Sequence, residues 1–249
     1  MNEQVQDTRK WWASALMIGA VVGLVSILLG ALGTKIGVWG FQGGFMLLGV
    51  GTVLAVVVFF LGLIAGAFSL SRRLRAELSA VGVGVVLSAV LLAVMGSQFL
   101  AATSVPAIHN ITTDVENPPA FDKLIAIREA AGANPTAYDA QQLAPLQAAA
   151  YPQLQPLISA VPTAEMLTKA VEVLTDMGLQ VVHVDRASGH IEATDETFWF
   201  GFKDDVVVRV RTEGDGSIVD VRSVSRVGQS DLGKNAARIS EILAGLQAG

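Results

Sequence analysis

Cysteine is absent from the 249 residues of the sequence. A chain without cysteine has no disulfide bond, no thiolate metal site, no catalytic thiol and no lipoprotein-type acylated cysteine. The three histidines, His109, His183 and His190, lack the close spacing of a metal-binding pair. A Gly-x-Ser-x-Gly elbow, a phosphate-binding glycine-rich loop and a dinucleotide fingerprint are missing as well. We therefore expect no metal and no cofactor, and no motif indicates an enzyme class.

Positive charge is also scarce. The sequence has 17 lysine and arginine residues against 22 aspartate and glutamate residues, a formal net charge of −5. A nucleic-acid-binding protein needs a concentrated basic surface. We therefore expect no nucleic-acid partner.

Long apolar runs, in contrast, fill the first hundred residues. Trp11–Leu32, Phe45–Leu70 and Leu78–Ala102 each reach the roughly 20 residues that a helix needs to cross a bilayer. None has a charged residue at its centre, so an ion or proton pathway has no candidate. The runs predict three transmembrane helices within residues 1–103 and a lipid bilayer as partner. The first run is long for a signal peptide, and we expect it to be retained as a helix.

The loop charges predict an orientation, because lysine and arginine near helix ends favour the cytoplasm. Five such residues belong to the amino-terminal segment and the second loop: Arg9, Lys10, Arg72, Arg73 and Arg75. The first loop, residues 33–44, has only Lys35, and none follows the third run until Lys123. We expect a cytoplasmic amino terminus in a bacterial inner membrane and a carboxy-terminal domain in the periplasm.

Small residues four apart recur in the three runs. The pairs are Gly19 with Gly23, Gly62 with Gly66, and Gly84 with Ser88. Such pairs let helix backbones approach closely. They indicate either packing among the three helices or a face that docks a partner protein.

Residues 104–249 have the pattern of one soluble α+β domain. Helical spacing covers residues 121–131 and 163–177, the first followed by an alanine-, glutamine- and proline-rich stretch with a short helix at 140–149. Thr163 and Ser230 are the expected caps of the last two helices. Period-two patterning predicts five strands: Gln180–Arg186, His190–Thr194, Thr197–Lys203, Val206–Thr212 and Ser217–Arg226. We expect an antiparallel sheet of about five strands covered by helices on one face.

Alternation along the strands assigns the two faces of the sheet. The core face is expected to carry Phe198, Phe200, Phe202, Val206, Val208, Val210, Val219 and Val221. The opposite face has a set of candidate binding residues: Trp199, Arg209, Arg211, Arg222 and Arg226. A polar face of an antiparallel sheet is often simply solvated. A tryptophan among arginines is also suited to an anionic or lipid headgroup, or to a protein.

One pair of residues has the chemistry of acid and base. His109 lies five residues before Asp114, next to Thr112 and Thr113. A histidine and a carboxylate are common partners in proton transfer. A domain of this size has such pairs by chance, so we expect a structural role and name no catalytic residue.

Two stretches resemble domain-of-unknown-function family 1499. One runs from Pro106 to Asp114 with Pro118–Phe121, and the other from Ile191 to Val206 and from Val219 to Ile239. The similarity is to the version fused to amino-terminal membrane helices, and this chain lacks a cysteine that some members have near the first stretch. The resemblance implies a bacterial envelope setting but no reaction. Residues within the family's motifs are His109, Thr113, Asp114, Arg222, Ser225, Arg226, Asp231 and Asn235. Asp231 favours a helix amino terminus, and Arg226 is a candidate partner for it.

Two hypotheses of function remain open at this point. The first is a non-enzymatic, membrane-anchored accessory subunit or binding module for a larger membrane complex or an anionic lipid. The second is a periplasmic hydrolase or transferase that uses His109 and Asp114. A purely structural envelope protein is a third possibility.

Overall fold

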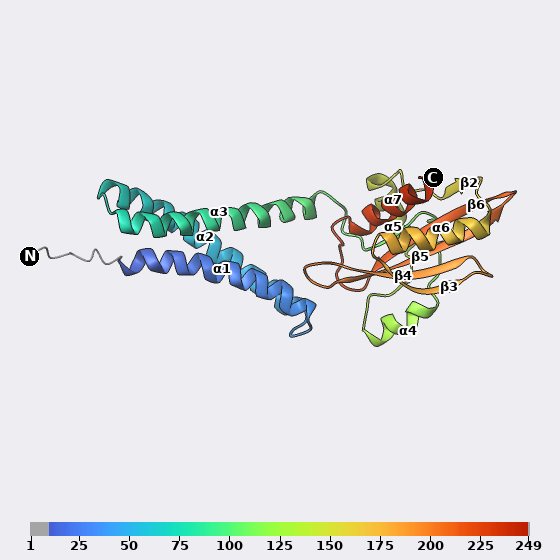
Figure 1. Cartoon of the computed structure of the whole chain (residues 1–249), viewed down its shortest axis with the longest axis horizontal. Coiled ribbons are helices and arrows are strands. Elements are labelled where there is room, and N and C mark those ends of the chain that lie inside the picture. The colour runs from blue at the N-terminus through green and yellow to red at the C-terminus, as the bar shows by residue number, and fades with distance from the viewer. Residues whose placement is uncertain (1–9, 249) are drawn as a thin grey trace, which may run out of the picture. The chain divides into compact units, whose positions relative to one another are not determined.

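The computed structural model describes residues 10–248. The chain divides into two units, a largely helical one of residues 1–100 with residues 199–201, and an α+β one of residues 101–198 and 202–249 (Figure 1). Arg9, which contributes to the predicted orientation, lies outside the described residues.

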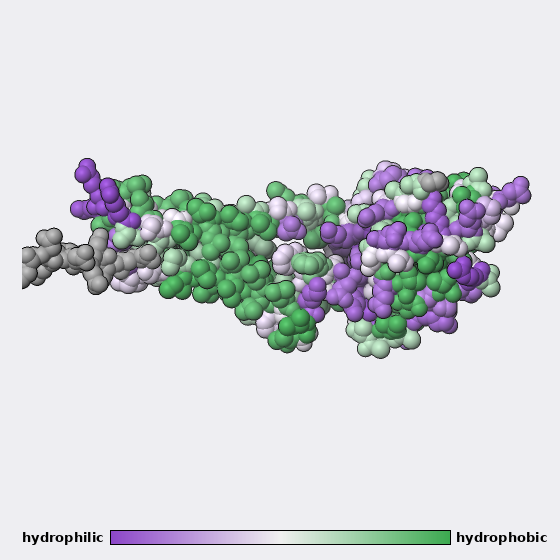
Figure 2. All heavy atoms as spheres, viewed as in Figure 1, coloured by the Kyte–Doolittle hydropathy of each residue, from purple (hydrophilic) through white to green (hydrophobic). Residues whose placement is uncertain are grey.

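Three long helices, α1 (Trp11–Lys35), α2 (Phe41–Ser71) and α3 (Arg75–Thr103), form the first unit. Each is long and apolar enough to cross a membrane, which confirms the three predicted helices. Their surface is almost continuously hydrophobic, whereas polar residues dominate the surface of the α+β unit (Figure 2). A hydrophobic exterior on this scale is stable only in lipid.

Glycine permits the close approach of α1 and α2. A Cβ atom on Gly51 would lie 2.6 Å from the carbonyl oxygen of Gly23, and one on Gly30 would lie 2.6 Å from that of Gly44. Of the predicted small pairs, Gly62 faces Val85 and Gly84 faces the backbone of Leu16. These glycines therefore serve packing within the helical unit.

Six strands form one antiparallel sheet in the α+β unit. They are β1 (Asn110–Thr112), β2 (Leu157–Ser159), β3 (Gln180–Asp185), β4 (His190–Glu196), β5 (Lys203–Glu213) and β6 (Gly216–Ser225). The order is β1-β6-β5-β4-β3, and β2 pairs with the beginning of β6 while β1 pairs with its end. The fold class predicted from the sequence is confirmed. The two short strands were not expected, because three residues give too little pattern to detect.

The main core lies between this sheet and two amphipathic helices, α6 (Thr163–Asp176) and α7 (Lys234–Gln247). Both helices lie along one face of the sheet in Figure 1. The valines predicted to face inward do so: Val206, Val208, Val210, Val219 and Val221 are all buried in this core. Residues 140–150 form the short helix α5 (Ala140–Ala150), as expected.

The opposite face of the sheet has a smaller cover. Helix α4 (Lys123–Ala130) supplies Leu124, which packs with Phe121, Val207 and Val224 in a second apolar cluster. The sheet is thus covered on both faces, with the larger core on the side of α6 and α7.

One predicted strand is wrong. Residues 197–202 form a loop between β4 and β5, and Phe198 is 74% exposed rather than in the core. The Thr197 amide donates to the Phe202 carbonyl (2.8 Å), and the Phe202 amide donates to the Thr197 hydroxyl (2.9 Å). Gly201, at φ 65°, supplies the left-handed turn between them. The alternating phenylalanines imitate a strand, but these bonds close a loop.

The two predicted helix caps are also wrong. Pro162 precedes the first residue of α6, so Thr163 is already helical, and its hydroxyl bonds that of Thr212. Helix α7 begins four residues after Ser230. The carboxylate of Asp231 accepts bonds from the amides of Gly233 (2.8 Å) and Asn235 (2.6 Å), so Asp231 does occupy the helix amino terminus.

We expect residues 104–249 to fold without α1–α3. The buried side chains of both apolar clusters come from this stretch alone, so no apolar surface of the core needs the helices. The isolated domain should be soluble, give a structured near-ultraviolet circular dichroism spectrum and unfold in urea in one transition. Aggregation, or a spectrum without near-ultraviolet signal, would mean that α1–α3 complete the core.

Candidate functional site

The sheet face opposite α6 and α7 carries the predicted arginines, and we call it the arginine face (Arg209, Arg211, Arg222 and Arg226). Residues 113–139, which include α4 and which we call the cover segment, pack over part of it. The sequence left a solvated face and a binding face as alternatives, and both would be exposed. Instead Arg222, Asp205, Asp220 and Glu192 on it are all buried.

Arg222 is held by uncharged groups. Its guanidinium donates to the side-chain oxygen of Asn110 (3.1 Å), the carbonyl of Pro119 (3.0 Å) and the carbonyl of Thr136. The rings of Phe121 and Tyr138 lie 5.5 and 5.9 Å from its central carbon. Among the described residues no carboxylate pairs with it. Burial, and then the charge of Arg128, lower its pKa to about 10, so the guanidinium stays charged at neutral pH.

Asp205 is the centre of a second buried network. It accepts bonds from Arg128 (2.6 Å), Arg226 (2.7 and 2.8 Å) and Thr194 (2.7 Å). Burial by itself raises the pKa of Asp205, but the bonds from Arg226, Thr194 and Arg128 outweigh it and lower the pKa below the ordinary value. Arg226 therefore pairs with Asp205 and not with Asp231, for which it was a candidate partner.

The exposed edge of the arginine face is also internally paired. Arg209 and Arg211 both donate to one oxygen of Asp220, each at 2.8 Å at the closest. Arg209 also contacts Asp114 at 3.1 Å. These guanidiniums already have carboxylate partners, so an anionic ligand would have to displace them.

Glu192 connects the sheet to the start of α4. Its carboxylate accepts bonds from the amides of Asp122 and Leu124 and lies 3.2 Å from His190. Burial raises the pKa of Glu192, while the bonds from His190, Asp122 and Leu124 lower it further than burial raises it. Glu192 thus holds the start of α4 against the sheet, and His190 bonds Glu192.

A third polar cluster lies at the start of α7. Arg238 bonds Asp195 (2.5 Å) and Asp204 (2.8 Å), and Asn235 bonds the hydroxyls of Ser223 (2.6 Å) and Ser225 (2.9 Å). Burial raises the pKa of the neighbouring capping residue Asp231, only partly offset by its bonds from Asn235 and Gly233. Asn235 and Ser225 of the predicted motif residues thus act in packing α7 on the sheet.

The structure does not bring His109 and Asp114 together. The backbone carbonyl of His109 accepts bonds from Ser225 and Asn235, whereas Asp114 accepts bonds from the amides of Glu116 and Asn117 and from Arg209. No hydrogen bond joins the two side chains within the described part of the chain. Thr113, between them, accepts a bond from the amide of Val221. The described residues also include no group of three or more histidine, aspartate or glutamate side chains arranged to hold a metal ion.

Trp199, the remaining candidate, belongs to the loop 197–202, which we call the aromatic loop, and not to a strand of the sheet. It is 54% exposed, next to Phe198 at 74%. The aromatic loop joins the last pair of the β4–β5 ladder, Glu196 and Lys203, whose side chains lie 3.8 Å apart. Trp199 thus lies on an exposed loop, whereas the predicted arginines lie on or directly after the strands and are bonded to other residues of the domain.

A family model described as a protein of unknown function, DUF1499, matches residues 110–246, more than half of the chain. The chain belongs to the DUF1499 family. None of the curated proteins matches the chain. Among solved structures, the crystal structure of Ara h 8.0201 aligns with 38% of this chain and 96% of that chain, at 14% identity and a TM-score of 0.27. A similarity at that level carries no argument about function.

The matched DUF1499 region contains all three polar networks and the aromatic loop. Sequence reasoning missed Arg128, Asp205 and Arg238 as members of these networks. A signal was available for Arg128 and Arg238, since a charged residue on the inward side of an amphipathic helix needs a buried partner. It also missed Phe198, because that residue was assigned to the core.

We expect Arg222→Ala to destabilise the DUF1499 domain by about 3 kcal/mol or more, because it leaves several buried acceptors without a donor. Arg222→Lys should restore little, since one ammonium cannot reach acceptors on three segments. Arg211→Ala is the control: that side chain is 45% exposed, and its loss should change stability by about 0.5 kcal/mol. Urea unfolding of the isolated domain measures all three. Equal effects of the Arg222 and Arg211 variants would show that Arg222 does not hold the cover segment.

Acid should unfold the domain partly through Asp205. Its folded-state pKa is lowered, so the stability from its ionised form is present above the unfolded pKa, about 4, and is lost as pH falls through the folded pKa. Asp205→Asn should lower stability at pH 7 and flatten the decline below about pH 4. The slope should not vanish, because the pKa of Glu192 is lowered too. Urea unfolding at several pH values tests this, and an unchanged slope in the variant would contradict it.

Proposed function

We propose that this DUF1499 protein is a membrane-anchored, non-enzymatic binding protein whose aromatic loop recognises a partner protein of a larger membrane complex. The observation that carries the proposal is the exposure of Phe198 and Trp199 on a loop closed by two hydrogen bonds. Three candidate transmembrane helices keep such a domain at a membrane.

The aromatic loop has the properties of a binding anchor. Each large aromatic side chain buries about 150–250 Å² when it is covered, and tryptophan is among the residues that dominate interface energies. The Thr197–Phe202 bonds order the loop before any partner arrives. Less conformational entropy is therefore lost on binding.

The arginines favour a protein partner over an anionic headgroup at this domain. Arg209 and Arg211 are paired with Asp220, Arg226 is paired with Asp205, and Arg222 is 4% exposed. A headgroup phosphate would have to compete with buried carboxylates for Arg209, Arg211 and Arg226, and Arg222 is buried among uncharged groups. An apolar pocket on a protein needs no such exchange, because it would bind the aromatic rings.

No observation favours the alternative of a hydrolase or transferase. A general acid or base needs a proton partner within hydrogen-bond reach. Asp114 accepts bonds from two amides and from Arg209. None of these donors is bonded to His109. We therefore propose no catalytic residue.

The same proposal places the DUF1499 domain in the periplasm of a bacterial cell, with the α2–α3 turn in the cytoplasm. Its support is the distribution of lysine and arginine. Lys10 precedes α1, and Arg72, Arg73 and Arg75 lie at the α2–α3 turn, which is the same end of the three helices.

Reporter fusions test this orientation. Alkaline phosphatase fused after Gly249 should be active, because it folds only outside the cytoplasm, whereas a fusion within residues 72–74 should be inactive. A fluorescent protein that folds only in the cytoplasm should give the reverse pattern. Fluorescence from the fusion after Gly249, with a silent phosphatase there, would overturn the proposed location.

For the aromatic loop, we expect Phe198→Ala/Trp199→Ala to abolish copurification of the partner from native membranes in mild detergent. Stability should change by no more than about 0.5 kcal/mol per site, because both side chains are exposed. Ile158→Ala is a matched control, since Ile158 is also 74% exposed but lies on β2. A photo-crosslinker at position 199 of the full chain should give a discrete protein adduct.

Two outcomes would contradict this assignment. Trp199 is the sole tryptophan in residues 104–249, so the fluorescence of the isolated domain reports on the loop alone. A blue shift with phosphatidylcholine vesicles, without any protein adduct, would mean that the loop binds lipid instead. A folded His109→Ala variant that loses a cellular phenotype, while the loop variant behaves as wild type, would favour the enzyme.

A further inference from the structure

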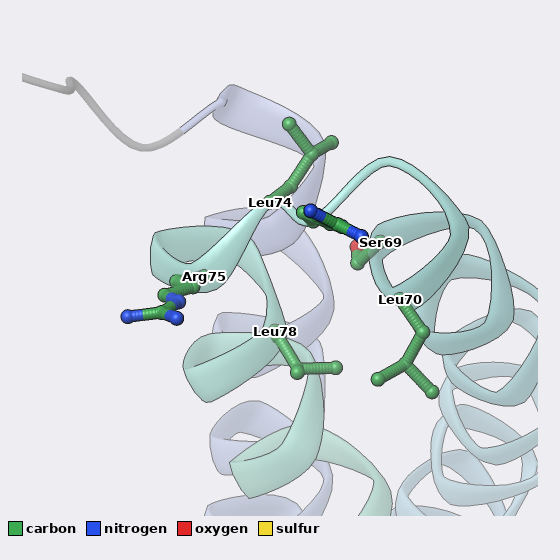
Figure 3. A pocket seen from close by; sticks show the side chains of 6 residues that line it. Ser69, Leu70, Leu74, Arg75 and Leu78 are labelled. Atoms are coloured by element: carbon green, nitrogen blue, oxygen red, sulfur yellow. The ribbon is translucent and has the colours of Figure 1, made fainter.

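The turn between α2 and α3 contains a pocket of about 340 Å³. Its lining comes from the last turn of α2, the connecting residues and the first turn of α3, and consists of Ser69, Leu70, Arg73, Leu74, Arg75 and Leu78. Figure 3 shows the side chains of Leu70 and Leu78 projecting from the two helices into the space between them. The pocket therefore lies where the apolar helices end and the first charged side chains begin.

The polar part of the lining is suited to an anion. Ser69 is fully buried, and its hydroxyl has no hydrogen-bond partner. Arg73 and Arg75 form no ion pair with any residue between 10 and 248. No carboxylate lines the pocket. Figure 3 shows the Arg75 guanidinium directed away from Ser69, and the first turn of α3 also contains the buried Glu77. A buried hydroxyl without a partner and the guanidinium of Arg73 are groups to which a phosphate can add hydrogen bonds, with the charge of Arg75 nearby.

An apolar groove continues from this pocket between the same helices. It has a volume of about 370 Å³ and shares Leu70 and Leu78 with the pocket. The rest of its lining is glycine, alanine, leucine and valine, including Gly66, Gly82 and Val86. A Cβ atom on Gly82 would meet nothing within 4 Å, so the groove is open at that residue. From the pocket to the groove, the lining thus changes from cationic to wholly apolar.

We propose that this pocket and groove bind one anionic phospholipid of the surrounding membrane. The phosphate binds at Arg73 and the Ser69 hydroxyl, the charge of Arg75 adds to its attraction, and an acyl chain lies in the groove beside Gly66 and Gly82. A charged head joined to a hydrocarbon chain matches the order of the two linings, whereas a soluble anion has nothing to place in the groove. Cationic pockets between transmembrane helices at the bilayer surface are suited to anionic headgroups. Two guanidiniums without a carboxylate also favour a lipid with net negative charge over a zwitterionic one.

Native mass spectrometry of the full chain in mild detergent tests the proposal, with phosphatidylglycerol and phosphatidylcholine of identical acyl chains as probes. Phosphatidylglycerol should bind at one site and resist delipidation, and phosphatidylcholine should bind at least tenfold more weakly. Arg73→Gln/Arg75→Gln should lower the affinity for phosphatidylglycerol about 10- to 30-fold. Arg72→Gln is the matched control for charge, because Arg72 is not part of the lining and its guanidinium lies 5.8 Å from the ring of Phe68.

A second pair of variants tests the groove. Gly82→Leu should fill it and reduce phosphatidylglycerol binding by a similar factor. Gly96→Leu should not, since Gly96 is on the same helix with open space around it but lies outside the groove. Size-exclusion chromatography before each measurement shows whether a variant remains folded.

Three results would overturn the proposal. They are equal affinity for the two lipids, equal loss in the Arg72 variant and in the Arg73/Arg75 variant, and binding unaffected by Gly82→Leu. Inorganic phosphate that displaces phosphatidylglycerol at equal concentration would also overturn it, because the site would then recognise a free anion without the acyl chain.

Discussion

Segments that lie far apart in the sequence meet at the buried guanidinium of Arg222. It joins β6 to Asn110 of β1 and to two carbonyls of the cover segment, at Pro119 and Thr136. Removing a guanidinium from water is costly unless its donors are bonded. Here three acceptors and two aromatic rings replace the water. Because the N–H groups of a guanidinium point in fixed directions, Arg222 also determines where the cover segment runs across the sheet.

The position of α4 depends on that arrangement. Once the cover segment is placed, the amides at the start of α4 reach Glu192, and Arg128 at its other end reaches Asp205. A small apolar cluster around Leu124 fills the space between these polar contacts. The arginine face is therefore a second interior of the domain, more polar than the core under α6 and α7.

Much of the fold could be predicted from the sequence because strong periodic signals decide it. Three apolar runs exceed the length of a bilayer crossing, and alternation along β5 and β6 assigns Val206, Val208 and Val221 to the core correctly. Alternation does not say whether the other face of a strand meets water or protein. The cover segment contains three prolines and one short helical period, at residues 121–131, and that period does not say which face of the sheet the segment covers. The arginines of the candidate site were found, but the burial of Arg222 depends on contacts 86 to 112 residues away in sequence.

The aromatic loop shows the opposite failure of sequence patterns, because its residues alternate like a strand but do not form one. Phe198, Phe200 and Phe202 alternate as an inward-facing strand would, yet the pairing of Glu196 with Lys203 leaves only residues 197–202 to reverse the chain. A strand through these residues would have required the reversal to occur at Asp204 and Asp205. Both carboxylates are instead buried partners, Asp204 of Arg238 and Asp205 of Arg128 and Arg226. Three ion pairs in the interior hold those residues within β5, so the turn forms earlier and carries the phenylalanines and Trp199 to the surface. The exposure of the aromatic loop is thus a consequence of the buried charges, and a sequence pattern based on hydrophobicity alone does not contain that information.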